Sequence, residues 1–161
     1  MSGVRILGIG SPSGDDQAGW LTVDALLAEG VRDHRDIVVR KLDRPGAGLL
    51  PLLENAPWVI LIDAMQGEGE AGRIRRFDQA DWINYRQGLS SHGFGVLAAL
   101  ALAEAMASLP ARLDLYGIEA GSVAPGDEPG AEVRSAAQRL ARVIGADLRV
   151  SLGFERLVPR S

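Results

Sequence analysis

Short apolar runs alternate along the chain with segments whose apolar residues recur every three or four positions. Residues 4–9, 36–42, 58–63 and 112–118 have the first pattern and are predicted to be strands. Residues 20–27, 49–54 and about 92–107 are predicted to be helices, as is a last segment that starts near Pro129 and carries apolar residues at 133, 136, 137, 140, 141 and 144. Residues 72–77, which contain solvated arginines, predict an edge strand, whereas residues 78–89 have no regular pattern.

The order of these elements predicts the fold class. Residues 58–63 form a continuous apolar run that stops at Asp63, as expected of a strand that is buried on both faces of a parallel sheet. Strands that alternate with helices indicate a mostly parallel, twisted sheet with helices on both faces. We therefore expect an α/β protein with three layers.

Three polar residues are predicted to meet at one edge of this sheet. Connections in such a fold are right-handed, so the carboxyl ends of the first and third strands lie side by side, where ligands bind. Asp16 follows the first strand, Asp63 ends the third, and His92 begins a helix. Two carboxylates and an imidazole suit a borderline divalent ion such as nickel, zinc or cobalt, with coordination positions left open for a substrate.

Each of these residues also has a simpler interpretation. Ser13 and Asp16 have the spacing of a capping box, in which Asp16 serves a helix start rather than a metal. His92 is also compatible with a polar surface position near a helix cap, and Asp15 with a turn or a helix end. Asp63 is harder to explain in this way, because burying an unpaired carboxylate is costly.

Composition narrows the possible functions. With 161 residues, 47% of them hydrophobic, one domain can form a full core. The net charge of -4 disfavours nucleic acid and anionic membranes as partners. The chain has no cysteine and no signal or membrane-spanning segment, which favours the cytoplasm. Residues 157–161 resemble the remnant of a cleavable tag, which leaves residues 1–156 as the domain.

Several other classes of protein fit less well. The glycines at 8, 10 and 14 lack the spacing of a dinucleotide fingerprint, because Ser13 holds the third glycine position. A zincin needs two histidines on one helix, and the only histidines here are His34 and His92. A receiver-type phosphoacceptor domain also combines an acidic pair with an aspartate after the third strand. It needs a late lysine, however, and the only lysine is Lys41.

Five motifs in order resemble those of the hydrogenase maturation endopeptidases, across nearly the whole chain. They are Gly8-Ile9-Gly10 with Gly14-Asp15-Asp16 and Gly19, Val59-Ile60-Leu61-Ile62-Asp63-Ala64, Arg75-Arg76-Phe77, Ser90-Ser91-His92-Gly93, and Gly117-Ile118-Glu119. The resemblance implies a phosphorylase/hydrolase-like sandwich that removes a C-terminal extension from the large-subunit precursor of a nickel-iron hydrogenase. It also implies that Asp16, Asp63 and His92 contact nickel that arrives in the precursor, so that the isolated protein is metal-free. We expect a monomer.

The resemblance leaves open which substrate is cleaved, what the metal does and whether the chain is catalytic. Ser11 stands where the family often has Asn, and Ala120-Gly121 replaces the usual Pro and the Glu or Lys that follows it. The metal could polarise the scissile carbonyl, activate water, or be recognised only, with a carboxylate as general base. A non-catalytic metal-sensing or chaperone-like member of the same fold is the alternative.

Overall fold

A five-stranded sheet with the order β2-β1-β3-β5-β4 forms the centre of the protein. The structure is a computed structural model that describes residues 3–31, 36–66, 69–78 and 96–152. Neighbouring pairs among β1, β2, β3 and β5 are parallel, and β4 runs antiparallel to β5. β4 lies at the edge of the sheet, as its arginines predicted. The strands are β1 Val4–Gly10, β2 Ile37–Asp43, β3 Trp58–Met65, β4 Ile74–Phe77 and β5 Arg112–Glu119.

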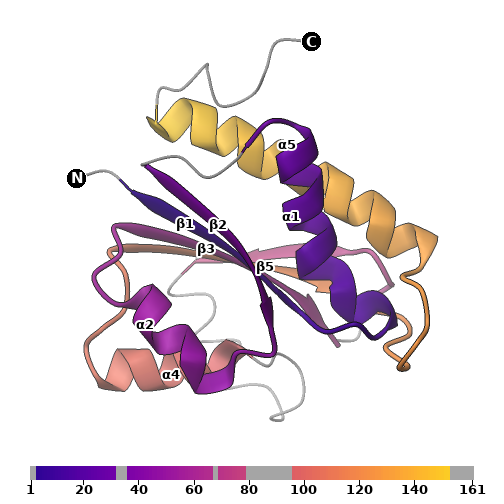
Figure 1. Cartoon of the computed structure of the whole chain (residues 1–161), viewed down its shortest axis with the longest axis horizontal. Coiled ribbons are helices and arrows are strands. Elements are labelled where there is room, and N and C mark those ends of the chain that lie inside the picture. Colours follow the sequence, from indigo (N-terminus) through magenta and orange to yellow (C-terminus); the bar gives the residue numbers. More distant parts are fainter. Residues whose placement is uncertain (1–2, 32–35, 67–68, 79–95, 153–161) are drawn as a thin grey trace.

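Helices cover both faces of the sheet, which gives the three layers predicted from the sequence (Figure 1). The helices α1 (Ala18–Ala28) and α5 (Ala131–Leu152) pack on one face, and α2 (Leu50–Leu53) and α4 (Val96–Ala105) lie on the other. Two 3-10 helices, η1 (Gly14–Gln17) and η2 (Gly46–Leu49), lead directly into α1 and α2. The predicted α/β class is therefore confirmed.

Each face of the sheet has its own hydrophobic core, because successive side chains of a strand point to opposite faces. In β3, Ile60 and Ile62 belong to the core under α1 and α5, whereas Leu61 and Met65 belong to the core under α2 and α4. Asp63 lies between Leu61 and Met65 in this alternation. Its side chain is therefore directed to the face that α2 and α4 cover.

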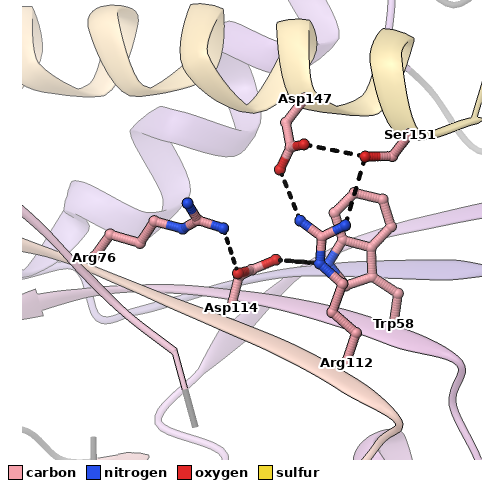
Figure 2. Close-up of polar contacts among 6 residues, drawn as sticks. All are labelled: Trp58, Arg76, Arg112, Asp114, Asp147 and Ser151. Carbon is pink, nitrogen blue, oxygen red and sulfur yellow. Dashed lines mark hydrogen bonds and ion pairs between the residues drawn. The ribbon is translucent and has the colours of Figure 1, made fainter. Parts of the chain in front are cut away.

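A cluster of charged and polar side chains connects β3, β4 and β5 with the helix α5, away from the carboxyl edge of the sheet (Figure 2). The Asp114 side chain is only 4% exposed and accepts hydrogen bonds from Trp58 Nε1, Arg76 Nη2 and Arg112 Nε, at 2.8, 2.8 and 3.0 Å. Arg112 stacks on the Trp58 ring at 3.9 Å and reaches Asp147 on α5 at 3.0 Å. Residues of three strands thus meet at one buried carboxylate, and Arg112 connects it to the helix α5.

Two of the boundaries that differ from the sequence prediction concern the predicted site residues. β3 continues to Met65, so Asp63 lies inside the strand rather than closing it. The described part of the helix predicted over 92–107 runs from Val96 to Ala105. Residues 92–95 lie outside the described residues, as do His34 and the tag-like residues 157–161. Among the described helices, none is long and apolar enough to cross a membrane.

Candidate active site

A pocket of about 500 Å³ opens at the carboxyl edge of the sheet, where β1 and β3 lie side by side. Asp16 and Asp63 both line it, as the topology predicted for these two residues. Apolar lining comes from η2, α4 and the loop after β5, through Leu49, Val96, Ala99 and Val123. The site therefore combines a paired acidic group with an apolar surface.

Asp63 is the more buried of the two acids, with 6% of its surface exposed. Burial raises the pKa of its carboxyl group well above the ordinary value, because the low-dielectric surroundings disfavour the charged form. The negative charge of Asp16 raises this pKa further, and a hydrogen bond with the main chain of Ala64 opposes the shift. The pKa of Asp63 therefore depends both on its burial and on the charge of Asp16.

Asp16 lies in η1 and is held by Ser11 rather than by a capping box. The Ser11 hydroxyl donates a hydrogen bond to Asp16 Oδ2 at 2.5 Å. Ser13 occupies the cap position but makes no side-chain cap hydrogen bond. The capping interpretation of Asp16 therefore has no support in the geometry, and the Asp16 carboxylate faces the pocket instead.

Asp15 points away from the pocket and organises the loop that forms its wall. Its buried carboxylate accepts hydrogen bonds from the main-chain N–H groups of Gly121 and Gly130, both at 2.7 Å. Gly14, in a left-handed conformation at φ +53°, lies so close to Ser122 O that a Cβ there would come within 2.5 Å of it. Asp15 thus holds a turn, and it also ties η1 to the start of α5 and to the loop that carries Val123, contacts that the sequence did not predict.

Replacing Asp15 by Asn is expected to destabilise the fold by about 2 kcal/mol. An amide oxygen is a weaker acceptor than a carboxylate, and the amide NH2 group would face one of the two main-chain N–H donors. Denaturant unfolding at neutral pH measures the loss. Asp24→Asn is the matched control, since Asp24 is half-exposed and pairs with the exposed Lys41. Equal stability of the two variants would contradict the anchoring role of Asp15.

The third predicted site residue, His92, lies outside the described residues. Among residues 3–31, 36–66, 69–78 and 96–152, no group of three or more His, Asp or Glu side chains is arranged to hold a metal ion. Asp16 and Asp63 therefore provide two potential ligands within the described part of the chain. The position of His92 relative to them stays a prediction.

Two further charged residues were not predicted, and one of them lines the pocket. Arg44, just after β2, lines the pocket and is exposed. Glu119 is fully buried at the end of β5, directly beside Met65 of β3, so it lies on the same face as Asp63. Strand alternation from Leu113 and Leu115 could have placed Glu119 on that face, whereas no sequence pattern signals Arg44, whose position depends on the pairing of β1 with β2.

A comparison with known families shows the family of this chain. The family model described as HycI, hydrogenase maturation protease, matches residues 45–145. The chain belongs to the hydrogenase maturation protease family. It is accordingly a peptidase by family, and the resemblance first drawn from the motifs is confirmed. The matched segment contains Asp63 and His92 but begins after Asp16.

Solved structures of hydrogenase maturation proteases share the whole fold. The endopeptidase HybD from E. coli superposes with a TM-score of 0.78 at 20% identity, covering 92% of this chain and 93% of that one. The [NiFe] hydrogenase maturation protease HycI from Thermococcus kodakarensis KOD1 gives 0.67 at 23% identity, with coverage of 92% and 93%. The hydrogenase 2 maturation peptidase from Thaumarchaeota archaeon SCGC_AB-539-E09 gives 0.66 at 24%, with 96% and 100%. No curated protein sequence matches the chain.

The departures from the usual family sequence have a local structural setting. The N–H of Ala120 donates to Met65 O at 2.8 Å, a hydrogen bond that a proline at this position could not make. A Cβ at Gly121 would lie 3.2 Å from Asp15 Oδ2, which is a tight contact. In this chain, Ala120 and Gly121 therefore allow the loop after β5 to be held by hydrogen bonds to β3 and to Asp15.

Proposed function

We propose that the chain is an endopeptidase that removes the C-terminal extension of a nickel-iron hydrogenase large-subunit precursor. Nickel carried by the precursor is contacted by Asp16, Asp63 and His92. The observation that carries this proposal is the electrostatically coupled pair Asp16 and Asp63 in a pocket of a hydrogenase maturation protease. The site thus distinguishes nickel-loaded from nickel-free precursor before cleavage.

The acidic pair suits a cation that arrives with the substrate. Without a cation, burial and the negative charge of Asp16 both raise the pKa of Asp63, because the charged form of Asp63 is poorly solvated and is repelled by Asp16. A divalent ion replaces the proton of Asp63 and neutralises both carboxylates, so binding depends on the metal. In the substrate complex, the ion supplies a Lewis acid beside the scissile bond or a recognition element, while a carboxylate accepts the proton of the attacking water.

The size and lining of the pocket suit a peptide segment. Its volume of about 500 Å³ lies in the range of roughly 300 to 1,000 Å³ that is usual for ligand pockets. The apolar wall of Leu49, Val96 and Val123 can shield the peptide from water, whereas the carboxylates face the metal. A C-terminal extension threaded across this edge of the sheet fits both surfaces.

The proposal is tested by incubating the protein with nickel-loaded and nickel-free precursor and measuring the precursor mass by mass spectrometry. We expect loss of the C-terminal extension with nickel-loaded precursor only, and a decrease in rate of about 100-fold for Asp16→Asn. Intact precursor in both samples would refute the protease proposal. Nickel-dependent binding of an uncleaved precursor would then favour the non-catalytic, metal-sensing alternative.

The receiver-type alternative is not supported by the position of the only lysine. Lys41 Nζ pairs with Asp24 at 2.9 Å on the surface, and Lys41 does not line the pocket that contains Asp63. A phosphoacceptor site needs that lysine beside the aspartate. Absence of labelling of Asp63 by acetyl phosphate is the expected result.

A further inference from the structure

Ser11 makes a side-chain contact with one of the proposed metal-contacting residues. Its side chain is buried, with 4% of the residue exposed, and its hydroxyl donates to Asp16 Oδ2 at 2.5 Å. Both residues line the pocket. A buried hydroxyl that donates to a carboxylate holds that carboxylate in one orientation, since rotating it away would leave the hydroxyl without a partner.

The main chain around this pair is held in place without the Ser11 hydroxyl. The N–H of Ser11 donates to Asp16 O at 3.3 Å, and the N–H of Asp16 donates to Ser13 O at 3.0 Å. Gly10 lets Asp16 O approach, because a Cβ on Gly10 would lie 2.7 Å from that oxygen. Asp15 independently anchors η1 to Gly121 and Gly130. The side-chain hydrogen bond is therefore free to set the orientation of the carboxylate rather than the path of the loop.

We propose that Ser11 is a positioning residue, which occupies Oδ2 of Asp16 and presents Oδ1 to the nickel-bearing substrate as a single ligand atom. This inference rests on the proposed function, because it takes Asp16 to be a metal contact. A hydrogen-bonded carboxylate is preoriented, so that less rotational freedom is lost when the ion binds. Ser11 thus assists binding through Asp16 and does not itself touch the substrate.

This role explains the departure of Ser11 from the family pattern. Asn and Ser both carry a donor that can reach a neighbouring carboxylate, although the amide is longer. The substitution therefore preserves the hydrogen-bond donor beside Asp16. Alanine has no donor, so Ser11→Ala removes the orienting hydrogen bond with the loss of one oxygen atom.

The test compares Ser11→Ala with Ser13→Ala in the full chain. Ser13 also lines the pocket, but makes no side-chain cap hydrogen bond, so it is a matched control. Nickel chloride is titrated into each protein, and the dissociation constant is taken from paramagnetic broadening of the main-chain amide signals around Asp16. We expect Ser11→Ala to weaken nickel binding by about 10- to 100-fold. Ser13→Ala and the thermal midpoints of both variants are expected to stay close to wild type.

The outcomes separate this inference from the proposed function. Unchanged nickel affinity in Ser11→Ala would overturn the positioning role, whether or not the thermal midpoint is lowered. Absence of nickel-dependent broadening around Asp16 in the wild-type protein would also overturn it. If the affinities separate as expected while nickel-loaded precursor stays uncleaved, the protease proposal fails and the role of Ser11 stands.

Discussion

Replacing Asp63 by Asn is expected to lower the rate of precursor processing by about 1,000-fold, because the amide can neither exchange a proton nor bind a cation as a carboxylate does. The substitution keeps the shape of the side chain in its buried position in β3. Cleavage of nickel-loaded precursor, followed by mass spectrometry, measures the rate. Asp43→Asn is the control, since Asp43 ends the neighbouring strand β2 but is exposed and does not line the pocket.

The same substitution is expected to stabilise the folded protein at neutral pH. The pKa of Asp63 is raised in the folded state, first by burial and then by the charge of Asp16, so the folded protein holds a proton that the unfolded chain releases. Stability therefore falls as the pH rises from about 3.9, the unfolded value, up through the raised folded pKa. An Asn carries no charge to desolvate and avoids this loss.

Denaturant unfolding of wild type and Asp63→Asn between pH 4 and neutral pH measures this difference. We expect the stabilities to be similar near pH 4 and to diverge in favour of Asp63→Asn as the pH rises. A constant difference across this range would show that Asp63 is not protonated in the folded state. Wild-type processing by Asp63→Asn would separately refute its role at the active site.

The parts of the fold that could be predicted from the sequence are those set by local pattern. The apolar run at residues 58–63 identified β3, because a strand buried on both faces needs no polar position. The amphipathic repeat after Pro129 identified α5, and all of its predicted apolar positions are buried. Topology alone then placed Asp16 and Asp63 at the same edge, since β1 and β3 are neighbours in the sheet.

The parts that could not be predicted depend on contacts between residues far apart in the sequence. Asp15 meets Gly130 across 115 positions, and Trp58 meets Asp114 across 56. Ser11 is only five positions from Asp16, yet the hydrogen bond between them requires the particular path of η1. No periodicity or motif encodes such distances. The sequence therefore identified the candidate acids but not the residues that orient them.

Replacing Asp114 by Ala is expected to cause the largest loss of stability among the substitutions proposed for this chain. The Asp114 carboxylate accepts hydrogen bonds from Arg76, Arg112 and Trp58, and without it their donors face an emptied site (Figure 2). Removing one partner of a buried ion pair costs about 3 to 5 kcal/mol. Because the side chains of Arg76 and Arg112 are 53% and 41% exposed and can be hydrated, we expect about 3 kcal/mol, at the lower end of that range.

The pH dependence distinguishes loss of this charged network from simple loss of packing. Burial tends to raise the pKa of Asp114, but hydrogen bonds from Arg76 and Trp58 and the charge of Arg112 outweigh it and lower the pKa below its usual value. The stabilisation is therefore present above the unfolded pKa of about 3.9 and is lost as the pH falls through the lowered folded pKa. Denaturant unfolding should show the difference between wild type and Asp114→Ala narrowing below about pH 4. Asp147→Asn is the control, because it changes only the outer, more exposed partner of Arg112. We expect it to lower the free energy of unfolding by less than about 1 kcal/mol. An equal loss of stability in both variants would show that the stabilisation comes from α5 rather than from the buried carboxylate.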